Sequence, residues 1–107
     1  VCVQIEDAEA VANIDDILLA RGVDVFFIGP SDLSQSMGFP GDPKAPPVAK
    51  AIAETLAKIR AAGHAPGMPA TTDAVADVVQ SGCRYIYTHL PRLLGASAGA
   101  YLKAARG

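Results

Sequence analysis

Residues 23–34 read VDVFFIGPSDLS, and this stretch decides how the rest of the chain folds. Its first six residues are almost all apolar, with β-branched and aromatic types, which is typical of a strand that is covered on both faces. The run stops at Gly29-Pro30, and a helix-start pattern follows at once, so we expect a short helix over 31–37. A buried parallel strand places a carboxylate, here that of Asp32, at the rim of a sheet in this way.

The same strand-then-helix order occurs four times along the chain. The predicted strands span 1–5, 23–28, 64–68 and 83–88, and the predicted helices span 7–21, 31–37, 46–62, 72–81 and a last segment after Pro91. Every crossover is long enough to require a helix, which predicts a parallel sheet built from right-handed βαβ units. Four units suit an open α/β sheet or half of an eightfold barrel, which takes ~250 residues when complete. Because Val1 lies inside a predicted strand, we favour a half barrel that is a piece of a longer protein.

Local signals predict how several helices begin, end and pack. We expect Asp7 to cap the first helix and Arg21-Gly22 to close its last turn. We expect Thr72 or Asp73 to cap the helix after the third strand. The apolar stripe of the first helix comprises Ala8, Val11, Ile14, Ile17 and Leu18, and the last helix is expected to turn Leu94, Ala98, Tyr101 and Leu102 inward.

Composition excludes several classes of protein. Half of the 107 residues are apolar and 19% are charged, so the chain can bury a core and is not disordered by composition. A net charge of −2 gives no basic stripe for nucleic acid, and no apolar run approaches the ~20 residues that span a bilayer. Cys2 and Cys83 fit no metal-ligand pattern, so we interpret both as small buried residues of a reducing, cytoplasmic compartment.

Ligands of parallel α/β folds bind at the carboxyl ends of the strands. The predicted strand ends place Glu6, Gly29–Asp32, Met68–Ala70 and His89 there. Two carboxylates on neighbouring strands, Glu6 and Asp32, suit a divalent cation such as Mg²⁺ or Mn²⁺. The alternative is that both acids are helix caps, which are common at strand–helix junctions.

The Gly29-Pro30-Ser31-Asp32 segment adds a second candidate feature. Gly29 allows close backbone approach, and Pro30 fixes φ. The amides of Ser31 and Asp32 would then lie unpaired at a helix N-terminus, which suits a carboxylate ligand. The segment could equally be a simple strand-to-helix turn, with Ser31 or Asp32 as N-cap.

Four short segments resemble the HpcH/HpaI aldolase family, whose members include the class II 2-keto-3-deoxy-acid aldolases. They are QIE at 4–6, FIGPSDLS at 27–34, MG at 37–38 and IRAAG at 59–63. The separation of 26 positions between Glu6 and Asp32 also resembles that family. The similarity covers the C-terminal half of the family's chain and is strongest from residue 1 to about 67.

The resemblance implies a (β/α)8 TIM barrel, of which residues 1–107 form the last four βα units. It implies that Glu6 and Asp32 hold Mg²⁺, Mn²⁺ or Co²⁺, and that Gly29, Pro30, Ser31 and Asp32 receive the carboxylate of pyruvate or a 2-oxo acid. Gln4 would face the same interior, and Pro69 would lie near the rest of the substrate. The implied reaction cleaves a 4-hydroxy-2-oxo acid to pyruvate and an aldehyde through a metal-stabilised enolate.

The resemblance also implies what residues 1–107 lack. The family's His–Asp pair and substrate-binding Arg belong to its N-terminal half, so we expect no catalytic residue in this chain and no activity from it alone. His64 begins a strand on the opposite rim. His89 ends the last strand on the same rim as the acids; it is interpreted as a loop histidine without function, with tuning of the pocket as the alternative. No lysine falls on a predicted strand, which argues against Schiff-base chemistry. The alternatives are an acyl-CoA lyase similar to the citrate-lyase β subunit, and a non-catalytic half barrel that assembles with a partner. In every case we expect a homo-oligomer without nucleic-acid or membrane partners.

Overall fold

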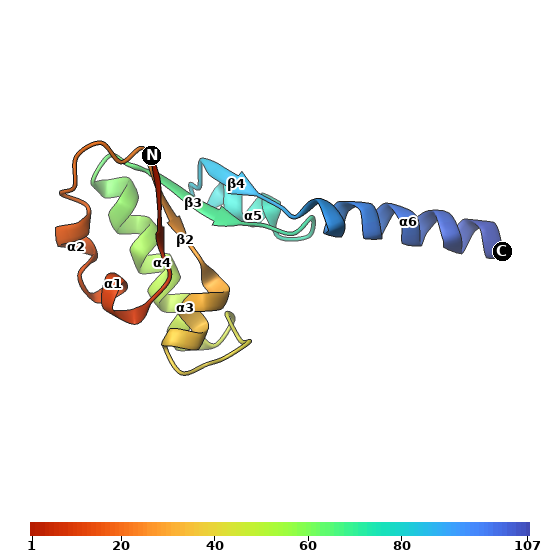
Figure 1. Cartoon of the computed structure of the whole chain (residues 1–107), viewed down its shortest axis with the longest axis horizontal. Coiled ribbons are helices and arrows are strands. Elements are labelled where there is room, and N and C mark those ends of the chain that lie inside the picture. The colour runs from red at the N-terminus through yellow and green to blue at the C-terminus, as the bar shows by residue number, and fades with distance from the viewer.

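The computed structural model describes all residues from Val1 to Gly107, and strands alternate with helices along the chain (Figure 1). The elements are β1 (Cys2–Ile5), α1 (Ala8–Ala12), α2 (Ile14–Ile17), β2 (Val25–Ile28), α3 (Pro30–Ser36), α4 (Pro46–Ala61), β3 (Ala65–Pro69), α5 (Val75–Gln80), β4 (Tyr85–Tyr87) and α6 (Leu90–Arg106). The four predicted strand–helix units are all present. None of the helices is both long enough and apolar enough to cross a membrane.

The four strands form one parallel sheet in the order β1-β2-β3-β4, as predicted. One row of aligned residues crosses it from Gln4 to Phe27, then to Gly67 and Tyr85. Because aligned residues in parallel strands point to the same face, these side chains share one face of the sheet. The alternate residues, among them Phe26, point to the other face, where the helices pack.

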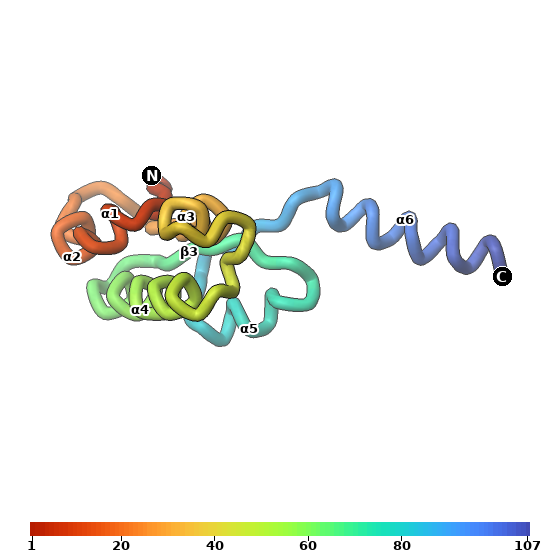
Figure 2. Tube along the Cα trace, turned by 90° about the horizontal axis from the view of Figure 1, so that it is seen from below, coloured from red at the N-terminus to blue at the C-terminus, as the bar shows by residue number.

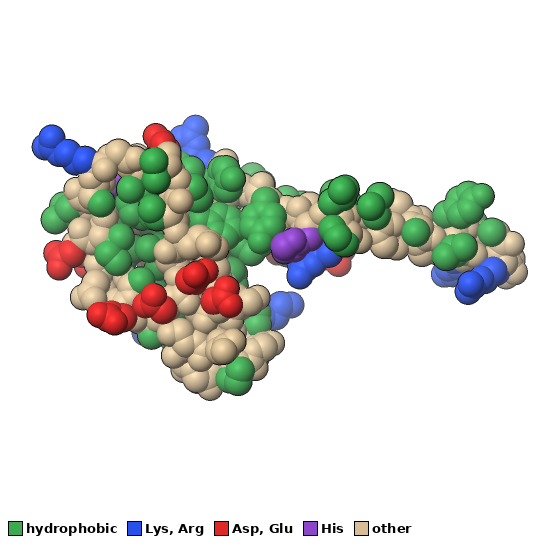
Figure 3. Space-filling view, viewed as in Figure 1, with side chains coloured by type: hydrophobic (Ala, Val, Ile, Leu, Met, Phe, Trp, Pro, Cys, Tyr) green, Lys and Arg blue, Asp and Glu red, His purple; other side chains and the backbone are tan.

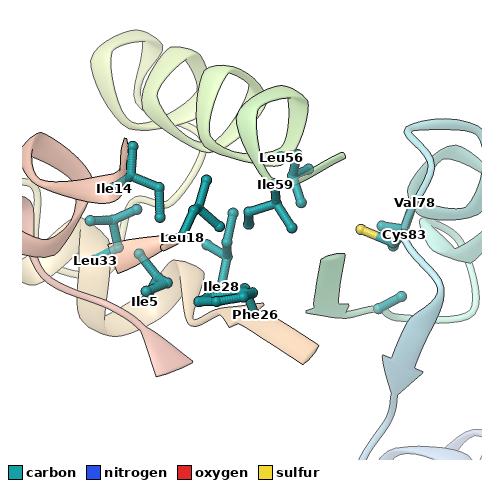
Figure 4. Packing of buried hydrophobic residues seen from close by; sticks show 11 residues of the cluster. Ile5, Ile14, Leu18, Phe26, Ile28, Leu33, Leu56, Ile59, Val78 and Cys83 are labelled. Atoms are coloured by element: carbon teal, nitrogen blue, oxygen red, sulfur yellow. The ribbon is translucent and has the colours of Figure 1, made fainter. Parts of the chain in front are cut away.

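An apolar core fills the space between the sheet and its helices. Figure 4 shows Ile5, Phe26 and Ile28 of the strands directed toward Leu56 and Ile59 of α4. The cluster comprises Ile5, Ile14, Leu18, Phe26, Ile28, Leu33, Leu56, Ile59, Ala70, Val78 and Cys83. Helices cover one face of β2, and side chains of the neighbouring strands cover Phe27 on the other, so the prediction that this strand is covered on both faces is confirmed. The second face remains open apart from side chains of neighbouring strands.

The predicted first helix is two short helices. Asp7 caps α1 as predicted, because its Oδ1 accepts a hydrogen bond of 2.7 Å from the Ala10 amide. The helix breaks at Asn13, whose backbone (φ −98°, ψ 14°) leaves the helical region. The Asn13 side chain makes no capping hydrogen bond, and the low helix propensity of asparagine agrees with a break that apolar spacing does not reveal. Since α2 already ends at Ile17, Arg21 lies outside its last turn, while Gly22 adopts the expected positive φ of 79°.

Several other predicted boundaries differ from the structure. β2 begins at Val25, and Asp24 lies before it, paired with the N-terminal amine of Val1. α5 begins after Ala74 without any side-chain cap, so the prediction of Thr72 or Asp73 as its cap was wrong. Cys83 is buried as expected, whereas Cys2 is exposed, and both thiols are free.

The last helix does not pack inward. α6 extends away from the sheet, so that the molecule measures 56 × 29 × 21 Å (Figures 1 and 2). Leu94 is 59% exposed and Tyr101 is 75% exposed, and no residue of α6 is buried. The spacing correctly predicts an amphipathic helix. Apolar spacing does not specify which surface covers the stripe, and nothing within residues 1–107 does so.

Candidate functional site

Two carboxylates meet beside the backbone of Gly29. Glu6 directly follows β1, and Asp32 is the third residue of α3, which directly follows β2. A Cβ built on Gly29 would lie 3.0 Å from Glu6 Oε2 and 4.0 Å from Asp32 Oδ2. Both carboxylates therefore border the same space at the carboxyl edge of the sheet. The structure brings the two predicted ligands together, while their binding of a metal stays a prediction.

Neither acid is a helix cap. The N-cap of α1 is Asp7, one residue after Glu6. The N-cap of α3 is Gly29, with Pro30 as the first helical residue, so Asp32 lies inside the first turn. The interpretation of Glu6 and Asp32 as caps was wrong, and so was that of Ser31. The position of Asp32 near a helix N-terminus still favours its negative charge.

One backbone hydrogen bond and one to a serine side chain hold the two acidic segments against each other. The Gly29 amide donates to the Ile5 carbonyl (3.1 Å), which joins the two strands at the point where both end. The Ala8 amide donates to Ser36 Oγ (3.0 Å), which joins the turn after Glu6 to the end of α3. The distance between the two segments is thus fixed on both sides of Glu6.

No cation neutralises this acidic pair. The ion pairs of the chain join the Val1 amine to Asp24, Lys50 to Glu54, and Lys58 to Asp15. Figure 3 shows acidic side chains gathered over the starts of α1 and α3, with no basic side chain among them on that face. No histidine, cysteine or further acid lies close enough to Glu6 and Asp32 to make a group of three possible metal ligands. The site therefore offers two oxygen ligands and leaves further positions to other groups.

The first turn of α3 presents unpaired amides next to the acids. Pro30 has no N–H group, and the first intrahelical hydrogen bond runs from the Leu33 amide to the Gly29 carbonyl (3.0 Å). The amides of Ser31 and Asp32 precede this bond and have no partner within the helix. Ser34 Oγ donates to the Ser31 carbonyl (2.7 Å), which stabilises the turn. The side chain at 31 is exposed and caps nothing.

The two other predicted substrate residues lie on the open face of the sheet. Gln4 is exposed and aligns with Phe27 of β2. Pro69 ends β3, is partly buried and aligns with Tyr87 of β4. Gln4 therefore lies on the same side of β1 as the acidic pair, and Pro69 lies at the same edge of the sheet on β3, the strand next to β2.

The two histidines lie at opposite edges of the sheet, as predicted. His64 precedes β3, and its Nε2 lies 3.0 Å from the Leu18 carbonyl oxygen while its ring packs edge-on against Phe26. These contacts give it a structural role. His89 follows β4 at the carboxyl edge, and its Nε2 lies 3.3 Å from the hydroxyl oxygen of Tyr87.

Sequence reasoning missed an aromatic group on the open face. The ring of Phe27 contacts Tyr85 (centroids 6.1 Å apart) and Tyr87 (5.5 Å), and Tyr87 contacts His89 (5.1 Å). The spacing of 85, 87 and 89 is a signal that could have revealed it, since alternate residues of a strand share a face. The contact to Phe27 depends on Gly67 in the strand between them, which alternation alone does not show.

Two cavities of the chain lie away from the acidic pair. One, of about 600 Å³, lies between α4 and α5, and apolar side chains such as Ile52 and Val78 line it. The second, of about 340 Å³, lies near the end of β4 and is lined by Ile86, Tyr87 and residues around them. The site at Gly29 is an open edge of the sheet rather than an enclosed cavity.

Comparisons with known proteins agree on one family. The family model described as HpcH/HpaI aldolase/citrate lyase matches residues 1–86. A 4-hydroxy-2-oxo-heptane-1,7-dioate aldolase of Salmonella arizonae is 50% identical over 76 residues, which are 71% of this chain and 29% of that protein.

Solved structures give the same result over nearly the whole chain. An HpcH/HpaI aldolase/citrate lyase family protein from Burkholderia cenocepacia J2315 superposes with a TM-score of 0.94 at 34% identity, over 99% of this chain and 42% of that one. An HpcH/HpaI aldolase from Desulfitobacterium hafniense DCB-2 gives 0.80 at 26% identity, over 96% and 41%. The chain thus spans less than half the length of these relatives.

Proposed function

The chain belongs to the HpcH/HpaI aldolase/citrate lyase family, and we propose that it supplies the metal- and 2-oxo-acid-binding part of an aldolase. The reaction would cleave a 4-hydroxy-2-oxo acid to pyruvate and an aldehyde. The observation that carries this proposal is the convergence of Glu6 and Asp32 on the space beside Gly29. The fold class is that of a partial TIM barrel, in agreement with the relatives of known structure.

The acidic pair fits a divalent cation. Two carboxylates that border one space, with no basic partner, repel each other unless a positive charge lies between them. Carboxylate oxygens are hard ligands and suit Mg²⁺, Mn²⁺ or Co²⁺, and a site with only two protein ligands leaves positions for substrate oxygens. When bound, the ion would supply Lewis-acid polarisation of the keto group of the substrate.

Other residues of this chain would bind and orient the 2-oxo acid. The unpaired amides of Ser31 and Asp32 would donate to its carboxylate, and the dipole of α3 adds to the attraction. The side-chain amide of Gln4 would lie on the same side of the sheet. Pro30 has no N–H to compete and fixes the backbone before the two donors. Together these groups hold the pyruvate part of the substrate in one orientation.

We also propose that groups outside residues 1–107 carry the proton transfer. His64 lies at the far edge of the sheet, and His89 lies two strands away from Gly29 at the end of β4. Lys44 lies in a loop, and the other lysines lie on α4 and α6, so none projects from a strand toward the site. Residues 1–107 alone should accordingly bind metal and pyruvate but show no turnover.

The exposed apolar side chains of α6 favour a second candidate, in which this half barrel serves assembly with a partner and no catalysis. Leu90, Leu93, Leu94, Tyr101 and Leu102 are all exposed (Figure 3). The open face of the sheet would be covered in the same assembly. The two candidates differ in whether the protein turns over a 2-oxo acid when Mn²⁺ is present.

Calorimetric titration of Mn²⁺ and of pyruvate tests the main proposal. Glu6→Gln and Asp32→Asn should each weaken Mn²⁺ binding by more than the roughly tenfold loss seen when an outer-shell group is removed. Asp7→Asn is the matched control, because it changes a neighbouring acid that caps α1 and should leave the affinity unchanged. Unchanged Mn²⁺ affinity in both site variants would refute the proposed metal site.

A further inference from the structure

Phe27 is nearly fully buried although it lies on the open face of the sheet. Its exposed fraction is 5%, and the side chains that cover it include Tyr85 and Tyr87 on the next strand but one. Gly67 makes this possible, because the intervening strand carries no side chain at that point. The ring of Tyr87 therefore packs against Phe27, while the residue as a whole is 41% exposed.

The side chain of His89 contacts Tyr87 and does not cap α6, the helix that follows it. His89 is the N-cap residue of α6 by position, yet it makes no side-chain capping hydrogen bond. Its ring stands edge-on to that of Tyr87 at an interplanar angle of 81°, with Nε2 3.3 Å from the hydroxyl oxygen. The two polar groups thus form one unit where β4 ends.

This unit always has a hydrogen-bond donor left over. Neutral histidine carries one N–H and tyrosine carries one O–H, and their mutual hydrogen bond uses only one of the two, whichever tautomer is present. Protonated histidine leaves two. The unit can therefore bind an oxygen acceptor of a ligand, and the rings of Phe27 and Tyr87 offer an apolar surface beside it.

The unit lies at the same edge of the sheet as the acidic pair. β2 and β4 are separated only by β3, which is a distance of about 10 Å for two strand spacings. Pro69, at the end of β3, aligns with Tyr87. A ligand held at Gly29 by its 2-oxo acid group would extend across Pro69 toward Tyr87 and His89.

We propose that Tyr87 and His89 select the end of the substrate that becomes the aldehyde, by hydrogen bonding to a hydroxyl or carboxylate oxygen there. The inference rests on the proposed aldolase function. Substrates with an oxygen at that end should be preferred over those that carry a methyl group in its place. The two residues act as specificity determinants, and the chemistry at the keto group does not involve them.

The test is aldol addition of pyruvate to pairs of aldehydes of equal size, assayed with the whole enzyme and Mn²⁺. Glycolaldehyde is compared with propanal for the hydroxyl, and succinic semialdehyde with 4-methylpentanal for the carboxylate. Tyr87→Phe and His89→Gln should lower the preference for the oxygen-bearing aldehyde by about two- to tenfold, the effect of one hydrogen bond. Tyr87→Phe keeps the ring against Phe27, so its effect reports the hydroxyl and not the packing.

Further readouts separate this inference from the proposed function. Mn²⁺ and pyruvate affinities should be unchanged in both variants, and Lys50→Gln, at an exposed residue of α4, should change nothing. A preference that persists in both variants, or an equal loss of turnover with both aldehydes of a pair, would overturn the inference while aldolase activity stands. An enzyme that binds Mn²⁺ but adds pyruvate to no aldehyde would overturn the proposed function, and the inference with it.

Discussion

The backbone of Gly29 lies so close to Glu6 that a Cβ at position 29 would stand 3.0 Å from the carboxylate Oε2 and 3.1 Å from the Glu6 Cβ. Contacts this short force the neighbouring side chain to move. The backbone of Gly29 itself (φ −97°, ψ 90°) is open to other residues, so its need for glycine comes from this neighbour. Glycine is therefore needed at position 29 to leave room for the Glu6 carboxylate rather than to form the turn.

Gly29→Ala should weaken Mn²⁺ binding while it leaves the fold largely intact. The added methyl group displaces the Glu6 carboxylate, and the cost in stability should stay near about 1 kcal/mol, since the side chain can shift toward solvent. Calorimetry and chemical denaturation measure the two effects. Gly95→Ala on α6, where a Cβ meets nothing within 4 Å, is the control. A large loss of stability with unchanged metal affinity would contradict this reading of Gly29.

Gly67→Ala should destabilise the fold far more than a glycine substitution on α6 does. Its Cβ would lie 2.8 Å from Phe27 Cδ2 and 2.9 Å from the backbone oxygen of Tyr85, which cannot move without β4. Overpacking of this kind costs about 1–3 kcal/mol. Denaturation of Gly67→Ala beside Gly99→Ala, which has open space and gains helix propensity, measures it. Equal denaturation midpoints for the two variants would contradict the prediction, because they would show that β4 can shift at little cost.

The buried thiol of Cys83 should make the protein less stable at alkaline pH. Burial raises the pKa of Cys83, and the Ser81 hydroxyl and the Arg60 guanidinium oppose this only in part. A raised pKa in the folded state means that the folded chain holds this proton more tightly. Its contribution is complete below the ordinary thiol pKa and is lost as pH rises through the raised value. Cys83→Ala should lose less stability than the wild type between about pH 8 and pH 10, where thiols titrate, and identical pH profiles would contradict the prediction.

Substitution of Leu94 and Leu102 by glutamine should reduce self-association without loss of folding. Both side chains are exposed on α6, so the sheet and its core do not depend on them. An assembly that covers this helix would lose apolar burial worth roughly 1.5–3 kcal/mol for each leucine. Sedimentation velocity measures the shift, and circular dichroism shows whether the fold persists. An unchanged sedimentation coefficient would mean that α6 is not an assembly surface.

Much of the fold follows from residue patterns. The apolar run before Gly29 and the long crossovers predict a parallel sheet, and the strand ends place Glu6 and Asp32 at one edge of it. The proximity of the two carboxylates is a consequence of adjacent strands that end at the same level. These features depend on local periodicity and on chain direction, which a sequence displays directly.

Other features depend on contacts between segments that no local pattern contains. The break at Asn13 interrupts an otherwise regular apolar stripe, and the spacing of the apolar residues does not reveal it. The contact of Tyr85 with Phe27 passes over Gly67, which lies between them on β3 and is aligned with both. The exposure of α6 is a further example, because the apolar stripe of a helix predicts that some surface covers it but does not specify which surface.

His89 takes part in two contacts, because its side chain lies against Tyr87 while its backbone is the N-cap of α6. A helix of 17 residues is about 25 Å long, so a small tilt at its base becomes a large displacement at its tip. A contact that moves the tip sideways likewise tilts the base. Whatever packs against α6 sets the direction in which this helix leaves β4. In the proposed assembly, contacts on α6 would therefore also set the position of the His89 imidazole at the edge of the sheet, and the proposed choice of aldehyde would depend on them.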